Sequence, residues 1–321
     1  MEPPPTTPPP APAPTAPVMQ TVLGNVTPVH DPVVIKEGVR YYLFSAGSGI
    51  SVRCSLDRAR WEACGSVFDG APAWAREAIP GVGDLWAPDI AYFNGRYHLY
   101  YSASTFGRNR SAIGLATTPT LDRTSPDFGW TDHEAVVQSF SGNDYNAIDP
   151  NVVLDANGTP WMSFGSYWTG IKLVELDLET GLPVSDPPTL YSLARRPRSD
   201  SEANAIEAPF IVRRDGFYYL FVSFDACCQG ANSTYNVRVG RATDVTGPYV
   251  DRAGVSMMDG GGTVVIDGTT RWKGTGHQAV FQDGDDTFLV YHAYDAQANG
   301  TPTLRISPLE WTDGWPSIPL E

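Results

Sequence analysis

The feature that most constrains the fold is a phrase that recurs along the chain. Each copy opens with a short apolar run, passes through a polar turn and ends in an aromatic run. Four clear copies are "VHDPVVIKEGVRYYLFSAG" from Val29, "LWAPDIAYFNGRYHLYYSAS" from Leu85, "AIDPNVVLDANGTPWMSFGSY" from Ala147 and "AIEAPFIVRRDGFYYLFVSF" from Ala205. A degenerate fifth copy, "GHQAVFQDGDDTFLVYHAY", begins at Gly276. Apolar and aromatic runs around a glycine-containing turn predict a β-hairpin in every copy.

The spacing of the copies predicts how the hairpins assemble. The prolines of the first four copies, at positions 32, 88, 150 and 209, are 56, 62 and 59 residues apart. Further strand-like runs follow the hairpins, and helical periodicity is nearly absent outside a possible turn at 72–79. Repeats of about 60 residues with about four strands are typical of propeller blades. We therefore expect an all-β, five-bladed β-propeller over residues 21–321. A two-sheet sandwich is the alternative, and the even spacing favours radial closure.

Composition narrows the possible partners. The chain has 321 residues and a formal net charge of −14, which disfavours nucleic acid or an anionic membrane surface as the main partner. Acidic polymers are also disfavoured unless a local basic cleft binds them, so neutral substrates fit best. No apolar run approaches the roughly 20 residues of a membrane span.

The first twenty residues, "MEPPPTTPPPAPAPTAPVMQ", contain nine prolines. They lack the basic and apolar regions of a signal peptide, and their composition predicts an extended, polyproline-type linker. Such a linker commonly tethers a module to another domain, and here the expected partner is a carbohydrate-binding module. It also favours a secreted, extracellular protein, although a disordered tail without a role is an alternative.

The four cysteines decide little about the fold. Cys54 and Cys64 lie ten residues apart and could bridge a hairpin, whereas the adjacent Cys227 and Cys228 can form only a vicinal bond. There is no CxxC spacing, so a zinc or thioredoxin-like site is not indicated.

Acidic side chains occupy the start of the repeated phrase in three copies. Asp31 and Asp149 come one residue before the proline, and Glu207 comes two before it. In the second copy these positions hold Trp86 and Ala87, while Asp89 follows the proline. Because the innermost strand of each blade begins at one face near the axis, these three carboxylates are expected to converge.

Converging carboxyl groups indicate glycoside hydrolysis. One carboxyl must be protonated to release the leaving oxygen, and another must be ionised to activate water or attack. A third carboxylate nearby raises the pKa of the acid by repulsion. Glu207, beside apolar neighbours, is the expected acid, with Asp31 and Asp149 as base and modulator in either order. The simpler interpretation is that all three cap turns and strands.

The residues also carry a family resemblance. The phrases quoted above, with "GSYWTGIKLVELDLETG" and "FDACCQG", resemble the five-bladed glycoside hydrolases of family 43 over roughly residues 22–318, and most of all its endo-α-1,5-L-arabinanases. The resemblance implies an inverting enzyme that cleaves internal α-1,5 bonds of arabinan. It assigns Asp31 as general base, Glu207 as general acid, and Asp149 as the residue that raises the pKa of Glu207 and orients it.

The resemblance also implies substrate-binding residues. Besides Asp31, these are Trp86, Phe106, Gly107, Asn146, Ala147, Ile148, Asp149, Ser166, Tyr167 and Trp168. Trp86, Phe106 and Trp168 are candidate platforms for a sugar ring, although such a residue, taken alone, is more often part of the core. Tyr167 and Thr169 stand where arabinanases more often have Phe and Ser, which bears on subsite preference.

His277 opens the fifth copy where acids open the others, and a lone histidine is commonly structural. The resemblance implies that it binds a hydrated Ca²⁺ on the axis, with water as most of the ligands because calcium prefers oxygen. Among the remaining histidines, His30 is expected to help position Asp31, and His292 to be structural.

Two other functions remain open from sequence. One is an exo-acting relative, an α-L-arabinofuranosidase or β-xylosidase, and loops that open or block the cleft would decide between it and an endo enzyme. The other is a carbohydrate-binding propeller without turnover, which would have no need of three convergent acids.

Overall fold

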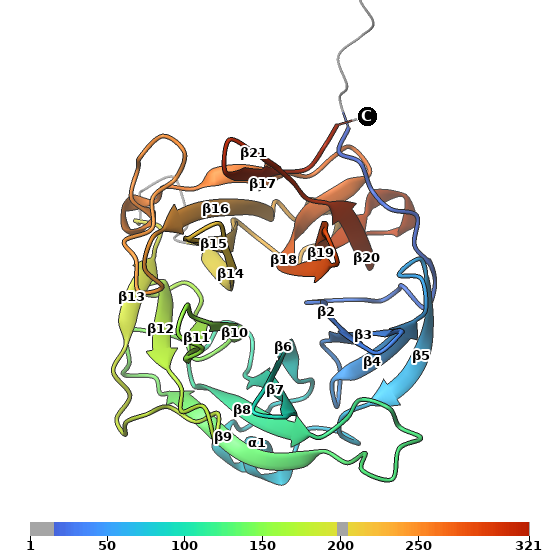
Figure 1. Cartoon of the computed structure of the whole chain (residues 1–321), viewed down its shortest axis with the longest axis vertical. Coiled ribbons are helices and arrows are strands. Elements are labelled where there is room, and N and C mark those ends of the chain that lie inside the picture. The colour runs from blue at the N-terminus through green and yellow to red at the C-terminus, as the bar shows by residue number, and fades with distance from the viewer. Residues whose placement is uncertain (1–15, 198–204, 321) are drawn as a thin grey trace, which may run out of the picture.

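The structure, a computed structural model, describes residues 16–197 and 205–320. Its sheets radiate from a central axis as blades, and the chain passes once around the ring (Figure 1). The predicted all-β, five-bladed propeller is therefore confirmed. The short helix expected near 72–79 is also present, as α1, Ala73–Ala78.

The first three blades follow each other in sequence. Blade 1 is a five-stranded sheet in the order β1-β5-β4-β3-β2, formed by Leu23–Gly24 (β1), Val33–Glu37 (β2), Arg40–Ser45 (β3), Ser51–Ser55 (β4) and Arg60–Ser66 (β5). Blade 2 has four strands, Trp86–Phe93 (β6), Arg96–Ala103 (β7), Ser111–Thr118 (β8) and Thr131–Ser139 (β9). Blade 3 also has four, Asn151–Leu154 (β10), Pro160–Phe164 (β11), Ile171–Glu175 (β12) and Tyr191–Ala194 (β13).

The last two blades complete the ring. Blade 4 has four strands, Ile206–Arg214 (β14), Phe217–Phe224 (β15), Asn236–Ala242 (β16) and Thr263–Ile266 (β17). Blade 5 has three, Trp272–Asp283 (β18), Asp286–Asp295 (β19) and Thr301–Pro308 (β20). A two-stranded sheet of Glu310–Thr312 (β21) and Trp315–Ser317 (β22) follows. Three short 3₁₀ helices are Gly230–Asn232 (η1), Met257–Asp259 (η2) and Ala296–Ala298 (η3).

The hairpins form where the sequence provides the right turn. In blade 2, Asn94 and Gly95 connect β6 to β7 with φ of 48° and 72°. In blade 4, Asp215 and Gly216 connect β14 to β15 with φ of 49° and 80°. Two positive φ angles in succession define the turn whose twist matches that of paired strands, and Asn-Gly and Asp-Gly are the dipeptides that adopt it most readily.

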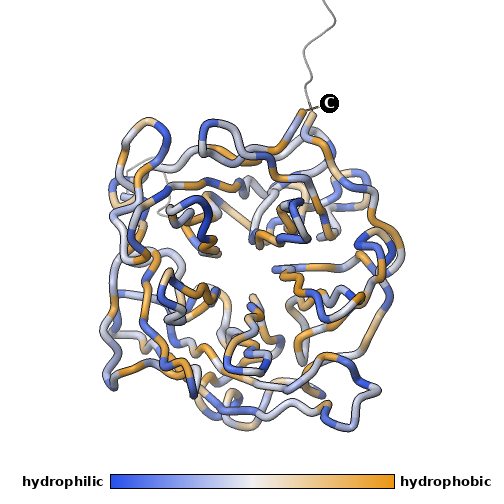
Figure 2. The backbone as a smooth tube through the Cα atoms, viewed as in Figure 1, coloured by the Kyte–Doolittle hydropathy of each residue, from blue (hydrophilic) through white to orange (hydrophobic). Residues whose placement is uncertain are grey.

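The hydrophobic core lies between neighbouring blades rather than at one centre. Figure 2 shows hydrophobic residues recurring along the strands around the whole ring. Buried residues of blades 3 and 4 pack together, for example Ile171, Leu173, Leu220 and Val222. Similar clusters join blades 2 and 3, and blades 4 and 5. In these clusters each blade buries its faces against its neighbours, so the sheets depend on the ring.

The ring closes between the last blade and the first. The inner strands contact each other in turn, and β18 contacts β2. The segment before β2 lies along β20, since the Gln20 N–H donates to the Ile306 carbonyl (2.7 Å) and the Val29 N–H to that of Pro302 (3.0 Å). Further along the same segment, β1 pairs in parallel with β5. The N-terminal segment therefore joins blade 5 to blade 1.

The expected linker is described only at its end. Residues 1–15 lie outside the described part of the chain, and the Val18 N–H donates to the Pro319 carbonyl (2.8 Å). A disulfide joins Cys54 to Cys64 and so links β4 to β5. No helix in the described ranges is long and apolar enough to cross a membrane.

Candidate active site

The three carboxylates lie where inner strands of different blades begin. Asp31 precedes β2, Asp149 precedes β10 and Glu207 is the second residue of β14. The backbone bends in the same way at this point of all five blades, with a positive φ at Asp31 (53°), Ala87 (45°), Asp149 (60°), Ala208 (53°) and His277 (48°). Positive φ is uncommon for residues other than glycine, so its repetition marks a shared feature of the blades. Glu207 stands one residue before it, which explains the different register.

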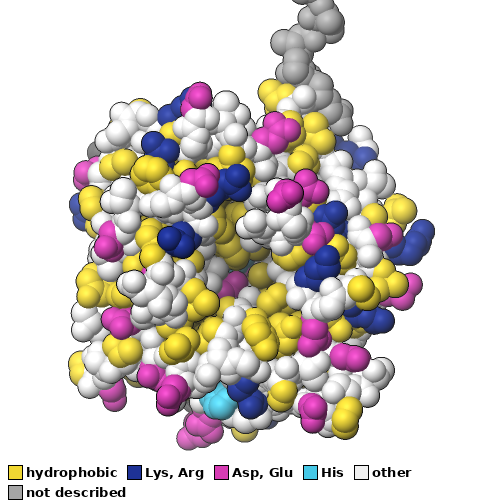
Figure 3. All heavy atoms as spheres, viewed as in Figure 1, with side chains coloured by type: hydrophobic (Ala, Val, Ile, Leu, Met, Phe, Trp, Pro, Cys, Tyr) yellow, Lys and Arg dark blue, Asp and Glu magenta, His cyan; other side chains and the backbone are white. Residues whose placement is uncertain are grey.

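Neighbouring blades hold these bends in place. In four blades the N–H of the bent residue donates to the preceding blade: Asp149 to Ser102 Oγ (2.9 Å), Ala208 to Asp149 Oδ2 (3.1 Å), His277 to Ser223 Oγ (2.9 Å) and Asp31 to His292 Nδ1 (3.2 Å). The carboxylates are thus positioned by backbone contacts between blades. Figure 3 shows that the ring is hollowed at its centre, with acidic side chains deep in the hollow.

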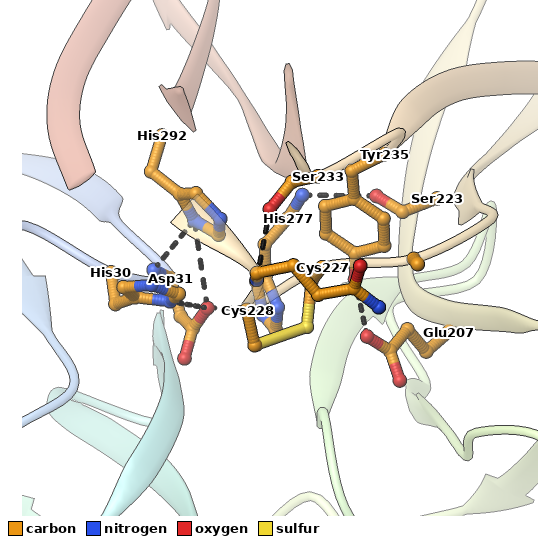
Figure 4. Close-up of a disulfide and its surroundings, with 12 residues drawn as sticks. His30, Asp31, Glu207, Ser223, Cys227, Cys228, Ser233, Tyr235, His277 and His292 are labelled. Atoms are coloured by element: carbon orange, nitrogen blue, oxygen red, sulfur yellow. Dashed lines mark hydrogen bonds and ion pairs between the residues drawn. A yellow bond between two sulfur atoms is a disulfide. The ribbon is translucent and has the colours of Figure 1, made fainter. Parts of the chain in front are cut away.

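Asp31 lies among three histidines (Figure 4). Its Oδ1 is 3.2 Å from His277 Nδ1, 3.4 Å from His30 Nδ1 and 3.6 Å from His292 Nδ1. Burial alone would raise the pKa of Asp31, but attraction to His277 and the hydrogen bond and charge of His30 hold it well below its usual range. Asp31 is therefore ionised at neutral pH, as a general base must be.

Glu207 has the opposite electrostatic environment. Burial, and then repulsion from Asp31, raise its pKa to about 7, against the effect of the Tyr235 hydroxyl. That hydroxyl donates to Glu207 Oε1 at 2.6 Å. A carboxyl group with this pKa is largely protonated in mildly acidic solution and can donate a proton.

Asp149 lies beside Glu207. Its Oδ2 accepts a hydrogen bond from the N–H of Ala208, the next residue after Glu207, at 3.1 Å. Burial, and then the charges of Glu207 and Asp31, raise the pKa of Asp149 well above its ordinary value. All three carboxylates therefore interact with one another, and the convergence expected from the sequence is present in the structure.

Two of the expected sugar-binding segments lie close to the acids. Ser111 Oγ donates to Asn146 Oδ1 (2.7 Å), and Asn146 Nδ2 donates to Ser166 Oγ (3.1 Å). The Tyr167 N–H donates to the carbonyl of Ile206 (2.9 Å). Burial, and then the charge of Glu207, raise the pKa of the Tyr167 hydroxyl. This segment thus adjoins the expected general acid.

The other expected residues have different surroundings. Trp86 opens β6 and is half-buried, whereas Phe106 and Trp168 are 79% and 38% exposed. Gly107, beside Phe106, has a φ of +73°. Ile148 is buried, and Ala147 is fully buried in the core shared by blades 2 and 3. The Ala147 side chain therefore faces other core residues, and only its backbone is left for a ligand.

Comparison with known proteins identifies the family. The sequence model that describes glycosyl hydrolases family 43 matches residues 23–316 of this chain. The chain belongs to this family. It is 46% identical over 294 residues to an extracellular endo-α-(1→5)-L-arabinanase of Bacillus subtilis, covering 90% of this chain and 87% of that protein.

Two further relatives of the family 43 chain are similar over their length. An extracellular exo-α-(1→5)-L-arabinofuranosidase of Cellvibrio japonicus is 45% identical over 300 residues, covering 90% of this chain and 86% of that one. The structure of a Cellvibrio cellulosa α-L-arabinanase complexed with arabinohexaose superposes with a TM-score of 0.87 at 42% identity, covering 92% and 96% of the two chains. The recognised resemblance is therefore confirmed, and the protein is a glycoside hydrolase.

Some residues of this family 43 site were not expected from the sequence. Tyr235, which is 1% exposed, contacts Glu207 from the loop between β15 and β16. His292 was expected to be structural, but its Nδ1 accepts the N–H of Asp31, so the neutral ring carries its proton on Nε2. The sequence contained one signal for the role of His292, because the other copies have serine at the corresponding position, in "FSAG", "YSAS", "MSFG" and "FVSF".

The histidines around Asp31 are the candidate metal-binding residues. Ligand atoms of His30, Asp31 and His292 lie within 4.8 Å of one another, and His277 contacts the same carboxylate. Calcium binds six to eight oxygen atoms, whereas this group offers mainly imidazole nitrogens. The residues therefore fit a calcium ion only if water supplies most of its ligands.

Proposed function

We propose that the protein is an inverting endo-α-1,5-L-arabinanase, which cleaves internal bonds of arabinan. The observation that carries the proposal is the contrast between two carboxyl groups on one axis: Asp31 is held ionised, whereas the pKa of Glu207 is raised to about 7. Support for the substrate comes from the relatives, whose names specify α-1,5-linked arabinose.

Each carboxyl group has a role in this mechanism. Ionised Asp31 takes a proton from the attacking water, while Glu207 gives its proton to the leaving oxygen of the sugar. Asp149 orients Glu207 through its hydrogen bond with the Ala208 N–H, and repulsion between the two carboxyl groups opposes their ionisation at the same time, which would keep Glu207 protonated. Because Tyr235 contacts only one oxygen of Glu207 among the described hydrogen bonds, the other oxygen remains for the substrate.

The substrate would bind along the segments next to the acids. Asn146, Ile148, Ser166 and Tyr167 line this region, and Trp86, Phe106 and Trp168 supply aromatic rings for stacking on a furanose, with Gly107 and the Ala147 backbone beside them. Partial exposure of Phe106 and Trp168 supports a role in contact with solvent or a sugar.

A largely hydrated Ca²⁺ held by His277 remains part of the proposal. The ion would supply positive charge near Asp31 and help keep it ionised. His277 is suited to this place because its Nδ1 already lies beside the carboxylate. The protein residues nevertheless account for the proton transfers themselves.

The relatives named above as extracellular support secretion of this protein. The proline-rich linker of residues 1–20 would then connect the propeller to another module, such as one that binds carbohydrate.

Product analysis on linear arabinan, with xylan beside it, tests the function. An endo enzyme lowers viscosity rapidly and releases mixed arabino-oligosaccharides, whereas the exo alternative, which the Cellvibrio japonicus relative exemplifies, releases only products from chain ends. NMR of the first product should show the anomeric configuration reversed. Retained configuration would exclude Asp31 as the base, and hydrolysis of xylan alone would exclude the arabinan assignment.

A further inference from the structure

The loop between β15 and β16, residues 225–235, contains a disulfide between the adjacent Cys227 and Cys228. Figure 4 shows this disulfide in the same region as Asp31 and Glu207. The loop belongs to blade 4, whereas Asp31 belongs to blade 1. One end of the loop is connected to Asp31 by hydrogen bonds, and the other end contacts Glu207.

The disulfide end is connected to Asp31 by hydrogen bonds. The Cys228 N–H donates to the Tyr294 hydroxyl at 2.8 Å, and that hydroxyl lies 3.1 Å from His30 Nε2. The other ring nitrogen of His30, Nδ1, is 3.4 Å from Asp31 Oδ1. Hydrogen bonds therefore connect the Cys228 N–H through the Tyr294 hydroxyl to His30, whose ring contacts Asp31.

The other end of the loop contacts the acid directly. Tyr235 is its last residue and donates to Glu207 Oε1. Its ring lies flat against the chain of blade 5, because a Cβ added at Gly276 would come within 2.2 Å of Tyr235 Cδ1. Tyr235 is thus fixed by close packing as well as by its hydrogen bond.

The two ends are held as one body. The N–H groups of Thr234 and Tyr235 both donate to the Ala226 carbonyl, at 2.9 and 3.1 Å, which ties the end of the loop to its start. Blade 5 approaches so closely that a Cβ at Gly300 would lie 2.4 Å from the Ala231 nitrogen. Movement at the disulfide would therefore be transmitted across the loop instead of being absorbed by it.

We propose that the Cys227–Cys228 disulfide is a positioning element that sets Asp31 and Glu207 relative to each other through this loop. The inference rests on the proposed roles of those two residues. A vicinal disulfide restricts the peptide between its cysteines, and Cys228 has a φ of 67° that an ordinary residue seldom adopts. Without the bond, the Cys228 N–H would lose the direction in which it meets Tyr294.

The test compares two disulfides of the same chain. Cys227→Ser with Cys228→Ser should lower kcat on linear arabinan about tenfold or more, because small displacements of reacting groups cost up to about a hundredfold. KM should change less than about twofold, since the sugar-binding segments lie on other loops. The matched control, Cys54→Ser with Cys64→Ser, removes the disulfide of blade 1 and should leave kcat unchanged. Treating this control protein with dithiothreitol should then reproduce the loss.

Tyr294→Phe provides an independent measurement. It removes the hydroxyl between Cys228 and His30 and should also lower kcat with little change in KM. Combined with the Cys227→Ser and Cys228→Ser changes, it should cost less than the product of the separate losses, because both act through one connection. A purely structural role for the loop would give independent, multiplicative effects.

Several results would overturn the inference. Wild-type kcat in the folded serine variant, or in dithiothreitol-treated control protein, would show that the disulfide positions nothing. If the serine variant does not fold, unchanged kcat in Tyr294→Phe would have the same meaning. Failure of the proposed function is distinct, since the unmodified enzyme would then not cleave arabinan at all.

Discussion

Tyr235→Phe tests the assignment of Glu207 as the proton donor. The substitution keeps the buried ring and removes only the hydroxyl that donates to Glu207 Oε1. The hydroxyl favours the ionised form of Glu207 and so opposes burial and the repulsion of Asp31, which raise its pKa to about 7. Removing it should raise the pKa of Glu207 further.

The size of the change follows from the hydrogen bond that is lost. A bond to an ionised carboxylate contributes about 1.5–3 kcal/mol, and one between neutral groups about 0.5–1.5 kcal/mol. The hydroxyl therefore favours the ionised form by about 1–1.5 kcal/mol. At about 1.36 kcal/mol for each pH unit, the pKa of Glu207 should rise by about one pH unit.

The assay is the pH dependence of kcat/KM, whose alkaline limb reports loss of the proton from the essential acid of the free enzyme. In the wild type, activity should fall as pH rises through about 7, because Glu207 must be protonated. In Tyr235→Phe this limb should move to higher pH by about one unit, whatever happens to the maximum rate. An alkaline limb that stays in place, or moves to lower pH, would refute the assignment of Glu207.

Three other substitutions test separate parts of the structure. Glu207→Gln should lose far more rate on arabinan than on arabinosides with activated aryl leaving groups, because only the former need the proton; equal losses in steady-state kinetics would contradict this. Asp89→Asn should stabilise the protein at pH 8 but not at pH 4. Burial raises the pKa of Asp89 to about 7, so its ionisation as the pH rises from about 4 to 7 costs the folded wild type up to about 4 kcal/mol. If the melting temperatures of variant and wild type differ by the same amount at pH 4 and pH 8, this prediction is wrong. His277→Ala should lose both the bound ion, by elemental analysis, and most activity; full activity without metal would disprove the calcium proposal.

The repeated phrase was sufficient to predict the blades and the meeting of the acids. Its turns contain Asn-Gly and Asp-Gly, and the bend shared by the five copies explains why Asp31 and Asp149 share a register. The sequence could not show that Asp89 contacts the backbone of the next blade. There its Oδ2 accepts the Val152 N–H at 2.7 Å, as Asn151 does for Ile211 in the next blade.

Residues that have no counterpart in the other copies of the phrase could not be predicted as part of the site. Tyr235 and Tyr294 contact the site from positions that no other repeat uses for this purpose, so comparison between copies gave no signal. Ala147 shows the opposite problem. It stands two residues before Asp149 in the sequence, but its side chain is buried in the core shared by blades 2 and 3. Local spacing identifies the start of a strand, whereas side-chain direction depends on how the blades pack.

Asp31 and His292 are separated by 261 positions, and their hydrogen bond crosses the seam at which the ring closes. During synthesis on the ribosome, Asp31 would emerge long before His292, so their hydrogen bond could form only after most of the propeller had been synthesised. Turnover of substrate would therefore begin only when the final blade has docked. Appearance of activity during refolding should consequently report the last step of assembly rather than the formation of individual hairpins.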